Sequence, residues 1–256
     1  MPSQAARDRA VGHGQPDEEL PLLRDRQRNI GLVTRARRHF MQDVSRSRAD
    51  VVLLFCYTIT GLLDASSVSI WGAFVSMQTG NTVYIGLGLA APSESTRWIK
   101  SLTSLASFCA GSFLFSSLHG RFSPAQRWVV CASSLVQALL ILGAAVTVTL
   151  LPKPGVGDEI GWHVLVPIAL VALQSCGQAV TSRALKYNSL TSVVLTSIYC
   201  DLFSDAKLFA LDNVDRNRRL SAPVLLVLGA FSGAAMEVDV RNKGRARGLD
   251  SLGFSP

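Results

Sequence analysis

Long stretches of this sequence carry no charge, and they constrain the fold more than any other feature. Asp64 is the only charged residue between positions 51 and 91, and none occurs at 101–118 or 128–151. Uncharged apolar runs of about 18 residues or more are long enough to cross the hydrocarbon core of a bilayer. A soluble helical core could imitate one such run, but not five or more in succession. We therefore expect an all-α fold, a polytopic transmembrane helical bundle in a lipid bilayer.

The apolar segments are expected at 51–70, 72–91, 101–118, 128–151, 162–182, 189–210 and 221–238. Because cytoplasmic loops carry an excess of Lys and Arg, the charges bear on how many segments cross. Seven crossings from a cytoplasmic N-terminus would put the basic tail outside. A re-entrant 72–91 gives six crossings and an inside tail, but leaves Arg216, Arg218 and Arg219 outside. Six and seven crossings both stay open.

Residues 1–50 form a polar arm with ten arginines and no lysine. We expect it to be cytoplasmic and mostly disordered, with its last part forming a basic helix on anionic lipid headgroups. Glu18, Leu22 and Leu23 fit the acidic-dileucine pattern of a vacuolar or endosomal sorting signal. We therefore expect a multi-pass membrane protein that is located in a vacuolar, endosomal or plasma membrane.

The membrane domain, 51–238, reads as two weakly related halves at about 51–151 and 162–238, followed by a polar basic tail at 239–256. Each half has an apolar helix, a small polar break, a second helix and a glycine-containing third helix. Thr79-Gly80 aligns with Thr196-Ser197 at an offset of 117 residues. Segment 128–151 has no counterpart in the second half, so we expect a C-terminally shortened chain. Two membrane repeats with a binding site between them are a common transporter plan.

Asp64 is the first candidate site residue. An ionised carboxylate at membrane depth costs at least about 2.5–3.5 kcal/mol, so such residues usually face a protein interior or a wet cavity. Binding of a proton or cation would use it. Alternatively, Asp64 lies near a helix end and caps the next helix, because the residues after it, Ala65 to Ser67, suit a turn.

Gln78, Thr79, Gly80 and Asn81 form a polar cluster inside the second apolar segment. Gly80 is expected to loosen the helix and free backbone carbonyls for an ion or ligand, as in the broken helices of transporters. The alternative is that Gln and Asn side chains hold neighbouring helices together.

The corresponding cluster in the second half consists of Gln174, Gln178 and Thr196. Together with Asp64 and the Gln78–Asn81 cluster, it makes up the expected site for a substrate or ion.

Other classes of function have little support. Enzyme signatures such as GxSxG, HExxH or a Walker A loop are absent, so no enzyme activity and no cofactor are expected. The five cysteines and four histidines show no metal-ligand spacing, and no basic-aromatic pattern indicates nucleic acid. We expect a transporter-like protein that moves a small molecule or an ion. The alternative is a non-transporting membrane scaffold or sensor that acts through its basic arm.

The stretch "GLLDASSVSIWGAFVSMQTGNTVYIGLGLA" resembles the signature of the YoaK-like domain-of-unknown-function family of bacterial and fungal membrane proteins. The matching positions are Gly61, Asp64, Ala65, Phe74, Thr79, Gly80 and Asn81. The family's second half typically has a Gln-Asn-Ala step and a Thr-Gly step. Here Gln178-Ala179 or Gln174-Ser175 stands near the first, and Thr196-Ser197 at the second. The resemblance covers about residues 50–238 and implies a polytopic, transporter-like protein without naming a substrate.

Overall fold

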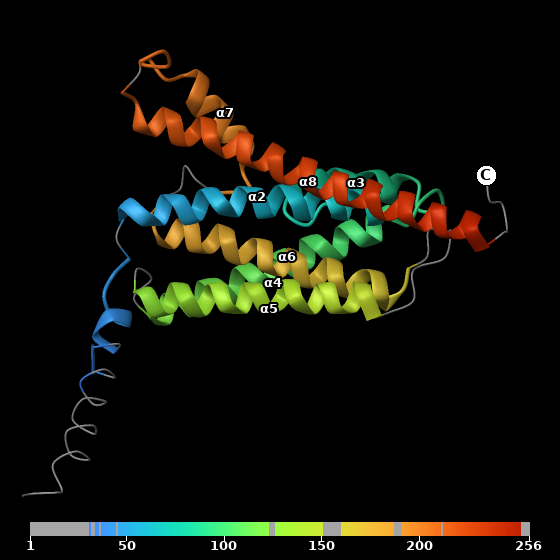
Figure 1. Ribbon diagram of the computed structural model, residues 1–256, viewed down its shortest axis with the longest axis horizontal. Helices are drawn as coiled ribbons and strands as arrows, with labels where there is room; N and C mark the ends of the chain where they lie inside the picture. Colours follow the sequence, from blue (N-terminus) through green and yellow to red (C-terminus); the bar gives the residue numbers. More distant parts are fainter. Residues whose placement is uncertain are drawn as a thin grey trace, which may run out of the picture. The chain divides into compact units, whose positions relative to one another are not determined.

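The structure is a computed structural model that describes residues 31, 34–35, 37–44, 46–122, 126–150, 160–186, 191–210 and 212–251. Side chains are described in all of these except 46–49 and 240–251. The described part of the membrane domain is helical, which confirms the expected all-α class (Figure 1). The helices are α2 (Arg46–Trp71), α3 (Gln78–Ala90), α4 (Arg97–Arg121), α5 (Arg127–Leu150), α6 (Trp162–Ala184), α7 (Leu195–Phe203) and α8 (Val214–Ser251).

Within the described part of the chain, five helices are long and apolar enough to cross a membrane: Asp50–Trp71 of α2, then α4, α5 and α6, and Val214–Asp239 of α8. In contrast, α3 has 13 residues and α7 has 9. At 1.5 Å per residue these measure roughly 20 and 14 Å, well short of a hydrocarbon core about 30 Å thick. Segments 72–91 and 189–210 are thus broken segments, each with a short helix. The five long helices make this a multi-pass integral membrane protein.

The outward faces of the long helices are apolar, as lipid requires. Large side chains project from them, including Phe55, Phe113, Leu139, Leu142 and Phe231, all more than half exposed. Soluble monomers rarely expose apolar patches of this extent, whereas lipid tails solvate them. The surface therefore agrees with the membrane assignment made from length and composition.

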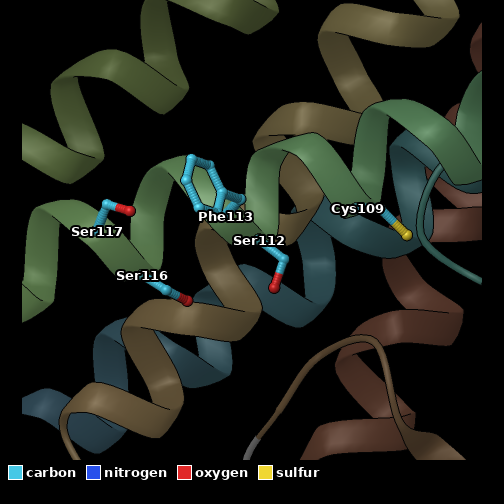
Figure 2. A pocket seen from close by; sticks show the side chains of 5 residues that line it. All are labelled: Cys109, Ser112, Phe113, Ser116 and Ser117. Atoms are coloured by element: carbon cyan, nitrogen blue, oxygen red, sulfur yellow. The ribbon is translucent and has the colours of Figure 1, made fainter.

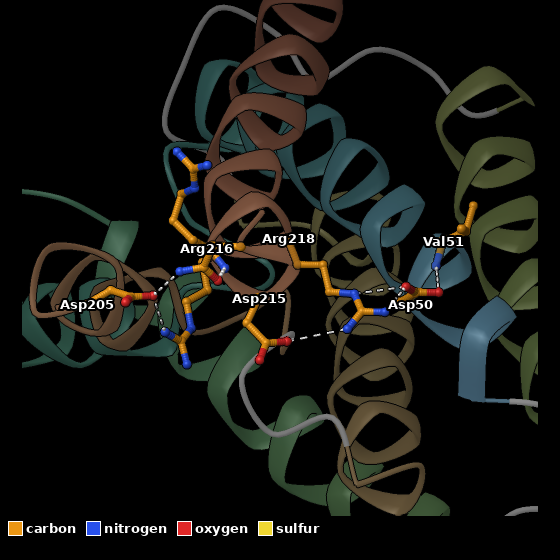
Figure 3. Close-up of polar contacts among 8 residues, drawn as sticks. Asp50, Val51, Asp205, Asp215, Arg216 and Arg218 are labelled. Carbon is orange, nitrogen blue, oxygen red and sulfur yellow. Dashed lines mark hydrogen bonds and ion pairs between the residues drawn. The ribbon is translucent and has the colours of Figure 1, made fainter. Parts of the chain in front are cut away.

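Helices α2 and α8 pack backbone to backbone through glycines. A Cβ on Gly61 would lie 2.0 Å from the carbonyl oxygen of Leu226, and one on Gly229 equally close to that of Thr58. Such small residues let membrane helices approach closely. Where the two helices begin, Asp50 and Arg218 form an ion pair with an O–N distance of 2.6 Å (Figure 3). The two helices are therefore joined along most of their shared length.

Helix α6 is the centre of the bundle, between α2 on one side and α4 and α5 on the other (Figure 1). Of its most apolar stretch, 67% is buried, against 22–28% in the other four long helices. Gly111 of α4 lies against Leu173, and Gly177 of α6 lies against Phe115. The α4–α6 pair thus also depends on glycine at its contact points.

Helices α2 and α6 meet over a much shorter contact than either makes with its main partner. Two apolar clusters lie beside α2, and only the first of them includes residues of α6. The Ile168 cluster consists of Val75, Ala144, Val164, Ile168 and Val171, with Leu63, Trp71 and Leu170 packed against it. The Tyr57 cluster consists of Tyr57, Ile198 and Ala222, with Leu54, Leu195, Leu225 and Leu226 packed against it.

The predicted arm and tail differ in detail from the structure. Residues Met1–Met41 form a unit of their own, and Gln42–Pro256 form the second, so the predicted arm boundary at residue 50 lies inside the second unit. Within that unit, the Arg127 N–H donates to the carbonyl of Gln42 at 3.0 Å. Helix α8 runs on to Ser251, through most of the predicted tail. Most of the arm, including the sorting residues Glu18, Leu22 and Leu23, lies outside the described residues.

Candidate functional site

The helical structure is interrupted between α2 and α3, at residues 72–77, and this interruption is the first break. Gly72 ends α2 with a φ of 74°, in the left-handed region that favours glycine, and its N–H donates to the carbonyl of Val68. The predicted turn at Ala65–Ser67 is wrong, because α2 continues through it to Trp71. Gly80 does not form the break either, since it lies in the first turn of α3. The peptide N–H and C=O groups of the break have no partners within a helix, and they need other ones because lipid offers none.

Asp64 supplies several of those partners from α2. One carboxylate oxygen, Oδ1, accepts the backbone N–H groups of Val75 and Ser76, both at 2.9 Å. The other, Oδ2, contacts the Ser76 hydroxyl. One turn further along α2, the Ser67 hydroxyl donates to the carbonyl of Ala73 at 2.7 Å. Asp64 thus caps the broken segment, and its carboxylate remains the only charged group along this part of the chain.

Asn81 holds the same break from α3. Its amide accepts the N–H of Phe74 at 3.1 Å and donates to the carbonyl of Phe74 at 2.7 Å. It also donates to Gln78 and to the Ser104 hydroxyl of α4, and it is fully buried. Gln78 in turn donates to the carbonyl of Val75 at 3.2 Å. The two amides therefore replace the peptide partners that a continuous helix would have offered.

Arg97, at the start of α4, closes the outer end of the break. Its Nε donates to the carbonyl of Gly72. Its guanidinium lies 3.9 Å from the centre of the Tyr84 ring, which is stacked on Phe74. The sequence analysis did not select Arg97. An arginine at a helix N-terminus is electrostatically unfavourable without a local reason, and that signal could have indicated it.

A second buried polar cluster surrounds Gln178 of α6. Its Oε1 accepts from the Thr60 hydroxyl of α2 at 2.9 Å and from the Ser192 hydroxyl at 3.1 Å. Ser192 belongs to the irregular segment before α7, as Ser76 belongs to the one before α3. Nearby, the hydroxyls of Ser182 and Thr191 lie 3.5 Å apart. All of these groups are uncharged.

The predicted site residues other than Gly80 do not all come together. Asp64, Gln78 and Asn81 come together at the first break, and Gln178 lies at the second polar cluster. Gln174 is buried on α6, one turn before Gln178. Thr79 and Thr196 are exposed, and neither takes part in these clusters. The sequence analysis missed Ser76, Ser104, Thr60 and Ser192, because single Ser and Thr residues are common throughout membrane helices.

Two surface hollows lie apart from Asp64. One, of about 590 Å³, runs along the outside of α4 and is lined by Cys109, Ser112, Phe113, Ser116 and Ser117 (Figure 2). The other, of about 200 Å³, lies between α3 and α4 and includes Tyr84, Arg97 and Trp98. Among the described residues, no group of three or more His, Cys, Asp or Glu side chains is placed to hold a metal ion.

The whole membrane domain matches one family model, described as a protein of unknown function, DUF1275, over residues 52–243. No curated protein and no solved structure matches the chain. The matched region contains α2 from residue 52 onward, both broken segments and the membrane part of α8, and it agrees with the YoaK-like resemblance. The chain belongs to the DUF1275 family of proteins of unknown function.

Proposed function

We propose that this protein is a transporter that moves a small molecule or an ion through a site between two inverted helical repeats. One observation carries the proposal, an exchange of helices between the halves. The first helix of the first half, α2, packs on α8 of the second half. The first helix of the second half, α6, packs on α4 of the first half. Transporters built from inverted repeats commonly bind their substrates at such an interface.

The helix directions support an inverted repeat. Thr60 of α2 contacts Gln178 of α6, and Trp71, later in α2, packs against the cluster around Ile168, earlier in α6. The two helices are therefore antiparallel, and α4 and α8 also run in opposite directions (Figure 1).

The helix registers support the same repeat. In the α2–α8 pair, Thr58 lies against Gly229, 171 residues later. In the α4–α6 pair, Phe115 lies against Gly177, 62 residues later. A repeat that maps α2 onto α6 and α4 onto α8 would turn one contact into the other if its offset were half the sum of these two separations. That offset is about 116 residues. The two halves of the sequence align at an offset of 117.

The two broken segments are held in a similar way, which supports a shared origin. Asp64 of α2 binds Ser76 shortly before α3 begins. Gln178 of α6 binds Ser192 shortly before α7 begins. In each half, a polar side chain of the first helix thus binds a serine in the break that follows it. Broken helices of this kind surround the midplane sites of many transporters.

Asp64 is the residue that we assign to the coupling ion, a proton or a cation. Among the described residues it has no ion pair, since the pairs there join Asp50, Asp205 and Asp215 to arginines. A half-buried carboxylate at membrane depth without a counter-charge is costly, and binding a proton or a cation removes that cost. Its contact with Ser76 suits both states, because a hydroxyl can donate to a carboxylate or accept from a carboxylic acid.

The charges support an N-terminus in the cytoplasm and five crossings. The start of α2, the α4–α5 turn, the end of α6 and the start of α8 lie at one end of the bundle (Figure 1). The basic residues of that end are Arg121, Arg127, Arg183, Lys186, Arg216, Arg218 and Arg219. By the positive-inside rule this end is cytoplasmic. Five crossings remove the conflict over the three α8 arginines, but they place the basic end of α8 on the opposite side, as seven crossings would.

A ligand screen tests the function. Purified protein is melted in detergent with ions, amino acids, sugars and lipophilic compounds, beside Asp64→Asn and the control Asp212→Asn. At 100 times its dissociation constant, a ligand adds about 2.7 kcal/mol of stability. We expect a ligand whose effect is lost in Asp64→Asn and kept in Asp212→Asn, because Asp212 is an exposed residue outside the broken segments. Equal effects in all three proteins would remove Asp64 from the site.

The scaffold or sensor function remains the second candidate, and the separate Met1–Met41 unit favours it. Under that function, deletion of residues 1–41 abolishes activity in cells. A transporter without the unit keeps its ligand-induced stabilisation in detergent, and deletion affects only its location. The same purified deletion variant, taken through the ligand screen, distinguishes the two functions.

A further inference from the structure

The contact between α2 and α6 has a polar middle, and an apolar cluster lies on either side of it along α2. We define the polar centre as Thr60, Ser175, Gln178 and Ser192. Toward the end of α2 it is followed by the Ile168 cluster, and one turn earlier in α2 it is preceded by the Tyr57 cluster. All four side chains of the polar centre are at least 95% buried. A polar region thus lies between two apolar clusters, one shared by α2, α5 and α6 and the other shared by α2, α7 and α8.

Ser175 is the residue of the polar centre that lacks a partner. It lies on α6 between Gln178, which binds Thr60 of α2, and Val171, which belongs to the cluster that Leu63 of α2 packs against. With three and four residues to these neighbours, it shares the face of α6 that meets α2. Its residue is 3% exposed, and its Oγ has no hydrogen bond among the described residues. A buried hydroxyl without a hydrogen bond is costly, and a bound molecule would supply one.

The chemistry of the polar centre determines the class of ligand. It offers three hydroxyls and one carboxamide, and no formal charge. The nearest charged group in the sequence, Asp64, is engaged with the backbone of Val75 and Ser76. A charged solute would find no counter-charge here, whereas a neutral molecule with donors and acceptors would match hydroxyl and amide groups.

We propose that the polar centre binds a small uncharged solute with hydroxyl or amide groups, and that the Ile168 and Tyr57 clusters are the gates on its two sides. The α2–α8 pair then moves against the other helices, because its contacts with α6 and α7 are much less extensive than the contact between α2 and α8. This inference rests on the proposed transport function. It places the binding site for the coupling ion in the first half, at Asp64, and the binding site for the solute beside Gln178 of the second half.

The test uses the full chain in liposomes and three neutral probes, glycerol, erythritol and urea, followed by light scattering as the vesicles swell. We expect faster uptake than in empty liposomes for at least one probe. Ser175→Ala should lower that uptake about two- to tenfold, the weight of one neutral hydrogen bond. It should also leave the melting temperature unchanged or raised, because the hydroxyl it removes has no partner in the protein. Ser117→Ala, on the outside of α4, is the matched control and keeps full uptake.

Three results would overturn the inference. Full uptake by well-folded Ser175→Ala removes Ser175 from the solute path. A wild-type protein that carries no neutral probe but binds a charged compound in the ligand screen contradicts the solute class and leaves transport standing. If the wild type carries no probe and no compound shifts its melting temperature, the transport function fails, and this inference fails with it.

Discussion

The two broken segments are both held by polar side chains, but the side chains and the groups they bind differ. Before α3, a carboxylate and a carboxamide, Asp64 and Asn81, bind backbone N–H and C=O groups directly. Before α7, Gln178 binds hydroxyls, and the residue 117 positions after Asn81 is the buried, apolar Ile198. The first break therefore depends on side chains that replace peptide partners, and the second depends more on packing. The two breaks thus differ in charge, since a carboxylate holds the first and an uncharged carboxamide holds the second.

The strongest test of this contrast is Asn81→Ala. It leaves the N–H and C=O of Phe74 without their side-chain partners in a buried place, at about 1–3 kcal/mol each, so we expect a loss of about 2–6 kcal/mol. The measurement is unfolding in detergent, with hydrogen exchange at Phe74 as a local readout. Ile198→Ala should cost about 2–5 kcal/mol through its cavity alone. Thr79→Ala, at an exposed position, is the control and should stay within about 0.5 kcal/mol.

Leucine substitutions at Asp64 and Gln178 compare the two first helices. Asp64→Leu orphans two backbone N–H groups, so we expect a loss of about 2–5 kcal/mol. Gln178→Leu orphans only the hydroxyls of Thr60 and Ser192, which can rotate toward backbone carbonyls, and about 1–2 kcal/mol is expected. Both are measured by thermal unfolding of the purified variants. An equal or larger loss of stability for Gln178→Leu would contradict the view that the first break depends more on its polar side chains than the second.

The sequence predicted the class of fold and the existence of both breaks, because uncharged length and clustered polar residues are local signals. It also brought Asp64, Gln78 and Asn81 into one candidate site. It did not locate the break itself, because Gly72, rather than Gly80, has the backbone conformation that ends a helix. It could not place Arg97 on Gly72, since a contact over 25 residues depends on how α4 returns to α2.

The exchange of helices was also beyond the sequence. A repeat with an offset of 117 fits halves that fold separately as well as halves that exchange helices. The partner of each helix is decided by close packing at glycines such as Gly61 and Gly229, where a side chain would clash with the backbone of the other helix. Glycine is common in membrane helices, so its presence alone does not name a partner.

Alanine substitutions at two glycines sharpen the comparison of the helix pairs. In Gly61→Ala, the new Cβ meets the backbone oxygen of Leu226 at 2.0 Å, and α8 must move. In Gly177→Ala, it meets side-chain atoms of Phe115 and Gln137 at 2.8–3.0 Å, which can shift. We expect about 2–3 kcal/mol for Gly61→Ala and about 1 kcal/mol for Gly177→Ala, by thermal unfolding. Gly86→Ala, where the added Cβ meets nothing within 4 Å, is the control.

The smallest expected effect concerns the turns that follow the two short helices. After α7, Asp205 accepts from the Lys207 N–H at 2.8 Å and from the Asn213 amide at 3.0 Å. These hydrogen bonds, the Lys207 N–H first, lower the pKa of Asp205 from its ordinary value of 3.8. Because the folded pKa is the lower one, the contribution of Asp205 to stability is complete above about pH 4 and is lost as the pH falls through the folded pKa.

The melting-temperature difference between wild type and Asp205→Ala should therefore shrink between pH 6 and pH 3. After α3, the matched change is Glu94→Ala, which removes an exposed carboxylate with no hydrogen bond among the described side chains. Its difference from wild type should be close to zero at both pH values. A constant difference for Asp205→Ala would mean that the turn before α8 is held without this carboxylate. The two turns would then be alike, and the contrast between the halves would be confined to the breaks themselves.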